Sequence, residues 1–131
     1  NPVTQIRTVK VTLSSAELLN SFSSAKQLIA APGSGNVIEV ISVTFRYNYL
    51  TAPYATNTVL ALYYSTVEAT SYSGIIDQLV STIRMASTGV NFNSASSTFD
   101  NQAVFIGTKT GNPTAGSGTL DVYVTYRIIT L

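Results

Sequence analysis

The stretch AAPGSGNVIEVI, residues 30 to 41, contains two closely spaced glycines of the kind that can wrap a backbone around a phosphate. A phosphate-binding loop of this type lies between a strand and a helix, because the helix N-terminus and a following lysine hold the phosphates. Here Gly35 is followed by Asn36 and then by a run of β-forming residues. The sequence therefore predicts that Gly33 and Gly35 form a tight turn between two strands and bind no nucleotide.

The acidic residues are the next candidates for chemistry, since a carboxylate pair can hydrolyse glycosidic bonds and a cluster can bind calcium. The chain has six, and they are spread singly along it: Glu17, Glu39, Glu68, Asp77, Asp100 and Asp121. No pair sits two residues apart on one strand face, and no loop has the spacing of calcium ligands. Spacing alone leaves open a carboxylate pair assembled across strands. We nevertheless expect no metal site and no cofactor.

The side chains that usually act as nucleophiles and bases are missing or isolated. The chain has no histidine and no cysteine, which removes the usual general base near neutral pH, the commonest metal ligand and thiolate chemistry. Serine is abundant, but no serine lies in a G-x-S-x-G turn, and no lysine or carboxylate is placed to act as its base. We expect no catalytic residues and no enzymatic activity.

Tyrosines are concentrated in YNYLTAPYATN, residues 47 to 57. Aromatic faces beside amide side chains suit sugar rings, so this segment is the best candidate for a ligand contact, such as a host surface glycan. The residues that would form it are Tyr47, Asn48, Tyr49 and Tyr54. The structural alternative is that Tyr47 and Tyr49 only continue the core face of the preceding strand.

The elements that must position these residues are mostly strands, because apolar and polar residues alternate with a period of two. TLDVYVTYRIIT, near the C-terminus, shows the alternation most clearly and predicts a half-buried strand. VIEVISVTFRYNY, from residue 37, alternates similarly. Its pattern predicts that Val37, Ile41, Val43 and Phe45 face the core and that only Glu39 interrupts the apolar side.

Further strands are predicted from VTQIRTVKVTL, AKQLIAA, TNTVLALYY and AVFIG. Ser14 and Glu17 match a capping box, which predicts one short helix over residues 14–22. SGIIDQLVSTIRMAS predicts one or two short strands with a turn, and STGVNFNSASSTFDNQ and GTKTGNPTAGSG predict loops. Together these patterns predict an all-β protein, a single domain over residues 1–131. The architecture that fits is an antiparallel β-sandwich, jelly-roll-like, with one short helix.

The composition excludes two classes of partner. Charged residues make up 10% of the chain, the basic ones form no cluster, and the net charge is +1. Binding to nucleic acid depends on neutralising phosphates, so we expect no nucleic-acid partner. No apolar run approaches the roughly 20 residues of a membrane span, and NPVTQIRTV lacks the pattern of a signal peptide. We expect no membrane partner.

Two of the predicted strands, residues 59–64 and 103–107, have no polar face. A strand that is apolar on both sides needs cover from its own core and from something else. We therefore expect a homo-oligomer with Leu60, Leu62 and Phe105 at the subunit interface. For a module of this architecture a trimer is the natural closed assembly.

The order of a strand, SSAELLNSF, LIAAPGSGNVIEVISVTFRY and a Tyr-rich loop ending near PYA resembles a group of small β-sandwich proteins of tailed bacteriophages. They occur on virions as capsid decoration (cement) proteins or as fibre and adhesin modules. The resemblance covers roughly residues 8 to 64, and LIAAPGSGNVIEV at this distance from the helix is its most specific part.

The resemblance implies a non-enzymatic structural protein of the virion. The role that the resemblance implies most directly is that of a capsid decoration subunit, which assembles as a trimer and contacts other virion proteins, such as the major capsid protein. The alternative that it leaves is a receptor- or carbohydrate-binding head module of a tail or fibre.

Overall fold

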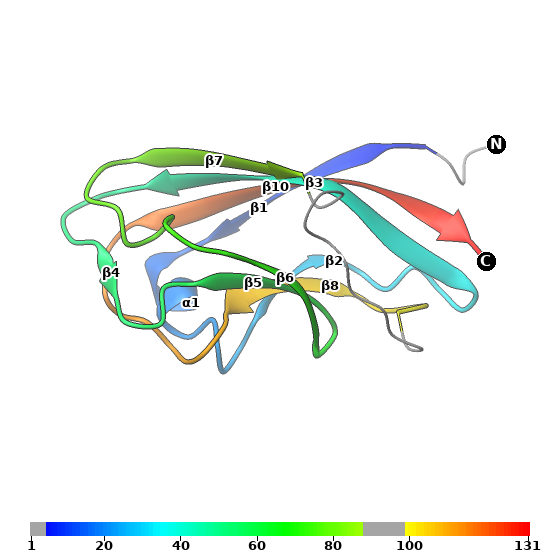
Figure 1. Cartoon of the computed structure of the whole chain (residues 1–131), viewed down its shortest axis with the longest axis horizontal. Helices are drawn as coiled ribbons and strands as arrows, with labels where there is room; N and C mark the ends of the chain where they lie inside the picture. The colour runs from blue at the N-terminus through cyan, green and yellow to red at the C-terminus, as the bar shows by residue number, and fades with distance from the viewer. Residues whose placement is uncertain (1–4, 88–98) are drawn as a thin grey trace.

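The computed structural model describes residues 5–87 and 99–131, which fold into two antiparallel sheets packed face to face (Figure 1). Most of the large apolar side chains lie between the two layers. The elements in chain order are β1 (Arg7–Leu13), α1 (Ser15–Leu19), β2 (Lys26–Ile29), β3 (Asn36–Asn48), β4 (Tyr54–Ala55), β5 (Leu60–Tyr64), β6 (Val67–Tyr72), β7 (Thr82–Ser87), β8 (Val104–Thr108), β9 (Thr114–Ala115) and β10 (Thr119–Thr130).

The strand order identifies the sandwich as a jelly roll. The first sheet has the order β1-β10-β3-β7, the second has the order β2-β8-β5-β6, and β4 pairs with β9 in a short separate ribbon. Early strands pair with late ones, β1 with β10 and β2 with β8, so a long antiparallel ribbon is wrapped around the core. The predicted fold class, an antiparallel sandwich with one short helix, is confirmed.

A β-bulge at Ile41 divides the longest strand, β3, into two halves. Ser42 lies opposite Thr125 of β10, whereas Val40 lies opposite the very next residue, Tyr126. Ile41 is therefore an extra residue on β3, and the side chains before it point to the opposite faces from those that simple alternation predicts.

The bulge corrects the predicted core face of β3. Val43 and Phe45 are buried as expected, but before the bulge Ile38 and Val40 are the buried residues. The prediction that Val37 and Ile41 face the core is wrong for this reason. Glu39 does not interrupt an apolar face. It lies on the exposed face, where it forms an ion pair with Arg127 of β10.

The predicted capping box is present at the start of α1. The Glu17 amide donates to Ser14 Oγ at 3.2 Å, and the Ser14 amide donates to the Glu17 carboxylate at 2.9 Å. The helix ends at Leu19, earlier than predicted, and turns bonded to Leu18 and Asn20 carbonyls lead the chain to β2. Leu18 is fully buried, which anchors the helix at the edge of the core.

The region after β5 contains a strand that the sequence patterns did not predict, β6, which pairs with β5 along the second sheet. The following segment, residues 73–81, is irregular, and Ile75 and Ile76 within it are fully buried. SGIIDQLVSTIRMAS then contributes one strand, β7. Most of the predicted loop STGVNFNSASSTFDNQ lies outside the described residues.

Candidate functional site

The glycine turn at residues 32–36 uses its own polar groups within the fold. Gly33 and Gly35 have positive φ angles of 105° and 79°, as a sharp reversal requires. The Gly33 amide donates to the Asn101 side chain at 2.9 Å, and the Leu131 amide donates to the Gly35 carbonyl at 2.8 Å. β3 begins directly at Asn36. The prediction of a turn between two strands is confirmed.

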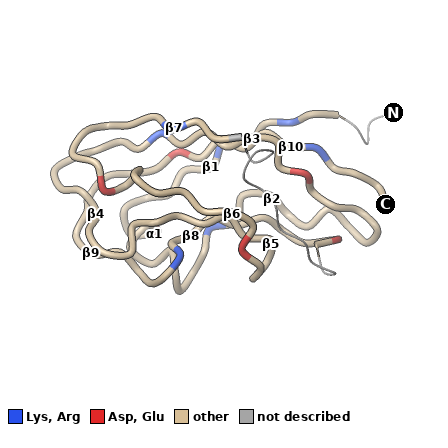
Figure 2. Tube along the Cα trace, in the orientation of Figure 1, with Lys and Arg blue, Asp and Glu red and all other residues tan. Residues whose placement is uncertain are grey.

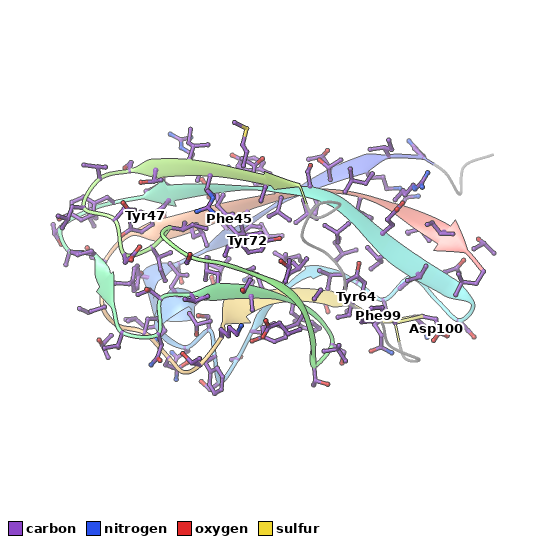
Figure 3. All side chains as sticks on the ribbon, viewed as in Figure 1. Phe45, Tyr47, Tyr64, Tyr72, Phe99 and Asp100 are labelled. Carbon is purple, nitrogen blue, oxygen red and sulfur yellow. The ribbon has the colours of Figure 1, made fainter. Side chains whose placement is uncertain are left out.

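Two of the four residues of the predicted tyrosine platform, Tyr47 and Tyr54, are part of the core, and Figure 3 shows Tyr47 between the two layers. Tyr47 and Tyr54 are 0% and 2% exposed, and their rings meet edge to face with centroids 6.3 Å apart. Tyr54 Oη donates to the Gly118 carbonyl at 2.6 Å. These two rings offer no face to a ligand, so their predicted role as ligand contacts is wrong. The core-face alternative holds for Tyr47.

The other two residues of the predicted platform lie at the rim of the first sheet and are half-buried. The Asn48 amide group donates to Thr119 at 3.2 Å and to Asp121 at 3.3 Å. Tyr49 Oη donates to the Thr51 carbonyl at 3.0 Å. Both side chains are used to hold neighbouring loops and strands, which leaves no aromatic platform at residues 47–54.

Burial raises the pKa of the core tyrosines. It raises the pKa of Tyr54, Tyr64 and Tyr72 to about 12. Within the part of the chain that the structure describes, the Tyr47 and Tyr72 hydroxyls are buried without a hydrogen-bond partner. Between the two layers, the Tyr72 ring packs edge to face on the Phe45 ring, with ring centroids 4.8 Å apart (Figure 3). The rings of Tyr47 and Tyr72 therefore contribute apolar packing to the core.

The predicted interface residues on β5 are also core residues. Leu60 and Leu62 are fully buried and face the first sheet, so they cannot meet another subunit. On the opposite face of β5, Ala61 lies beside Gly107 of β8. A Cβ atom built on Gly107 would lie 2.3 Å from the Ser21 carbonyl oxygen. The residues between α1 and β2 therefore supply the cover that the sequence patterns assigned to a neighbouring chain.

Phe105, the third predicted interface residue, lies on the outer face of the second sheet opposite Tyr63 and is half-buried. On the same face Tyr63, Phe22 and Ala25 line a shallow hollow of about 250 Å³. Phe22 is 51% exposed. Of the three predicted interface residues, only Phe105 is placed where another chain could contact it.

Charged residues are sparse along the chain, as Figure 2 shows. Among the residues that the structure describes, three ion pairs join Glu17 to Lys26, Glu68 to Lys109 and Glu39 to Arg127. The hydrogen bond from Thr12, with a second one from Asn48, holds the pKa of Asp121 below its ordinary value. Within residues 5–87 and 99–131, no three His, Cys, Asp or Glu side chains gather into a metal site.

An exposed apolar surface lies along β7, at the edge of the first sheet. Among the described residues, five of the eight large hydrophobic side chains that are strongly exposed belong to it: Leu50, Leu79, Val80, Ile83 and Met85. We call these five residues the apolar edge. They are 66–77% exposed. The sequence predicts one or two short strands over residues 73–87 but not their exposure, because the alternation there is weak.

The residues of the apolar edge are neighbours in space. Ile83 and Met85 lie on the outer face of β7, opposite Arg46 and Thr44 of β3. Leu79 and Val80 lie just before the strand, separated from it by Ser81. Leu50 is brought beside them because the Tyr49 amide donates to Ser81 Oγ at 3.1 Å. Exposed apolar side chains gathered at one sheet edge in this way suit contact with another protein.

Comparison with known proteins gives a likeness of fold. No protein-family profile matches the chain, and no curated protein matches it. A chain in a solved structure titled "Cyanophage Pam1 capsid asymmetric unit" is similar, with a TM-score of 0.50 and 19% sequence identity. The alignment covers 95% of this chain and 84% of that chain. The two proteins share a fold over nearly the whole of this chain.

No helix in the described residues is long and apolar enough to span a membrane. The longest apolar segments are strands whose side chains fill the core between the sheets. The described residues thus form an all-β scaffold with an apolar edge.

Proposed function

We propose that the chain is a non-enzymatic structural protein of a bacteriophage virion, a capsid decoration subunit that assembles as a trimer and contacts the major capsid protein. The observation that carries the proposal is the likeness of fold, over 95% of the chain, to a chain of the cyanophage capsid asymmetric unit. The resemblance of residues 8 to 64 to small β-sandwich proteins of phage virions supports it independently.

The surface chemistry supports the same proposal. Only 10% of the residues are charged, and the net charge of +1 gives little electrostatic repulsion between copies of the chain. The three described ion pairs tie together parts of the same subunit. The apolar edge leaves large hydrophobic side chains exposed to water, and such a surface suits association with another protein.

The alternative, a receptor- or carbohydrate-binding head module, loses its main support in the structure. It depended on a sugar platform at residues 47–54, and Tyr47 and Tyr54 are buried. Asn48 and Tyr49 remain near the surface but are held by hydrogen bonds within the chain. We therefore retain the capsid role as the proposal.

Gold-labelled antibodies against the purified chain, applied to particles of the phage that encodes it, test the proposal. We expect label distributed over the capsid. Label confined to the tail would overturn the decoration role and leave a virion role. Particles without label, while the same antibodies recognise the chain in the infected host, would overturn the virion role. A light-scattering mass of about 42 kDa, three times the 13.9 kDa of the chain, is expected for the free trimer.

A further inference from the structure

We propose that Met85 is a site of reversible oxidation by hydroperoxides, and that its conversion to methionine sulfoxide makes part of the apolar edge polar. This modification is independent of the virion role, because it needs only the chemistry of one side chain and the place of that side chain on β7.

The composition concentrates oxidation chemistry at one atom. Cysteine and methionine are the side chains that peroxides oxidise most readily. The chain has one methionine and no cysteine, so Met85 carries its only sulfur atom. Tryptophan and histidine are absent as well. A hydroperoxide therefore meets a single reactive side chain.

The structure leaves the Met85 side chain open to water. It is 77% exposed, and no large hydrophobic side chain among the described residues is more exposed. It lies on the outer face of β7, opposite Thr44 of β3, whereas the next residue, Ala86, packs against the core on the other face. Within the described chain β7 is the outermost strand of its sheet, so no further strand flanks Met85 on its other side. A small oxidant can reach the sulfur without any movement of the fold.

The oxidation needs only the peroxide. The thioether sulfur of Met85 attacks one oxygen of the hydroperoxide, so an S–O bond forms and the O–O bond breaks. The sulfur loses two electrons, and the remainder of the peroxide leaves as water, or as an alcohol from an organic hydroperoxide. A methionine sulfoxide reductase reverses the change, because two thiols become a disulfide and the oxygen leaves as water.

The sulfoxide changes the surface on which it lies. The thioether is apolar, whereas the S–O group is polar and accepts hydrogen bonds. Ile83 lies two residues earlier on the same face of β7 and is itself 67% exposed. Oxidation thus places a polar group beside exposed apolar side chains. Because Met85 lies outside the core, the folded structure should keep its stability.

Mass spectrometry of the folded chain, treated with hydrogen peroxide, tests the site. We expect a gain of one oxygen, about 16 Da, at a rate within about three-fold of that of N-acetylmethionine amide. Peptide mapping should locate the oxygen on Met85. The matched control is Met85→Leu, which should gain no oxygen under the same conditions. Oxidation more than about ten-fold slower than that of the model compound, or an equal gain in Met85→Leu, would overturn the proposal.

Retention on a phenyl column tests the consequence for the surface. The oxidised chain should elute earlier than the native chain, about as early as untreated Met85→Gln, and treated Met85→Leu should not move. The two stereospecific methionine sulfoxide reductases together should restore the native retention. The melting temperature should change by less than about 2 °C on oxidation. Unchanged retention of the oxidised chain, a sulfoxide that the reductases cannot remove, or a larger loss of melting temperature would refute the change of surface. None of these results depends on where antibodies label the virion, so the two proposals can fail separately.

Discussion

Thr12 on β1 donates a 2.7 Å hydrogen bond from Oγ1 to the carboxylate of Asp121 on β10. Asn48 on β3 donates to the other carboxylate oxygen at 3.3 Å. Asp121 is only 8% exposed, although it lies on the outer face of the sheet. One carboxylate thus connects three adjacent strands of the first sheet.

Asp121→Asn should lower the free energy of unfolding by about 1–3 kcal/mol near neutral pH, because a charged acceptor of two hydrogen bonds is lost. The fold holds the pKa of Asp121 below its ordinary value, mainly through the hydrogen bond from Thr12. Its stabilisation is therefore present above the ordinary pKa of an aspartate and is lost as the pH falls through the lower, folded-state pKa. Urea titrations of both proteins at about pH 7 and about pH 3 should show the difference shrinking. Asp100→Asn is the control, and an equal loss at both pH values would contradict the assignment.

Tyr47 and Tyr54 provide a matched pair of adjacent buried phenols. Tyr54→Phe removes the 2.6 Å hydrogen bond to the Gly118 carbonyl and should lower the free energy of unfolding by about 1–2 kcal/mol. Tyr47→Phe removes a hydroxyl that has no partner among the described residues, so the expected change is within about 0.5 kcal/mol or slightly stabilising. Denaturant titration measures both values. Equal losses of unfolding free energy in the two variants would contradict the difference in hydrogen bonding between the two hydroxyls.

Alkaline pH should unfold the chain through its buried tyrosines. Burial raises the pKa of Tyr54, Tyr64 and Tyr72 to about 12, above the ordinary value of 10. A raised folded-state pKa means that the stabilisation is fully present below about pH 10 and is lost as the pH rises through about 12. The free energy of unfolding, followed with phenolate absorbance, should fall over that interval. Tyr72→Phe should make the fall shallower, and an unchanged slope would refute the contribution of Tyr72.

Gly107→Ala should be strongly destabilising. Its new Cβ atom would lie 2.3 Å from the Ser21 carbonyl oxygen, and backbone must move to admit it. Overpacking of this kind costs about 1–3 kcal/mol or more. Gly111→Ala is the control, since its Cβ would meet the end of the Asn57 side chain, which can shift at the cost of its exposed hydrogen bonds to Asn112 and Thr110 but without moving backbone. Thermal unfolding should separate the two variants, and equal melting temperatures would show that the α1–β2 connection moves freely.

The sequence predicts the strands of this fold where each one buries a single face. The regular alternation of TLDVYVTYRIIT and the capping box at Ser14 are local signals, and both predict the observed elements. The bulge at Ile41 is not predicted, because an extra residue in β3 becomes visible only against its partner β10. Pairing between distant strands therefore decides which side of β3 faces the core.

The candidate site could not be predicted for a related reason. The apolar residues of β5, such as Leu60, indicate that both faces of the strand are covered. They do not indicate whether the same chain or a neighbouring chain covers the outer face. The structure supplies the cover from residues between α1 and β2, through Ser21 above Gly107. Conversely, Ile83 and Met85 look like ordinary strand residues until β7 is found at the sheet edge. Burial is a property of the assembled layers and is not encoded in one segment.

The place of β10 in the first sheet bears on how the chain folds as it is synthesised. β10 lies between β1 and β3, so it pairs with residues made well before it in translation and separates them in space. Until the ribosome has released residues 119–130, β1 has no neighbour in its sheet and the sandwich stays open on one side. Folding must then wait for a late, long-range closure, which is characteristically slow in β-sandwiches. During that wait the apolar strands remain accessible to chaperones and to other nascent chains.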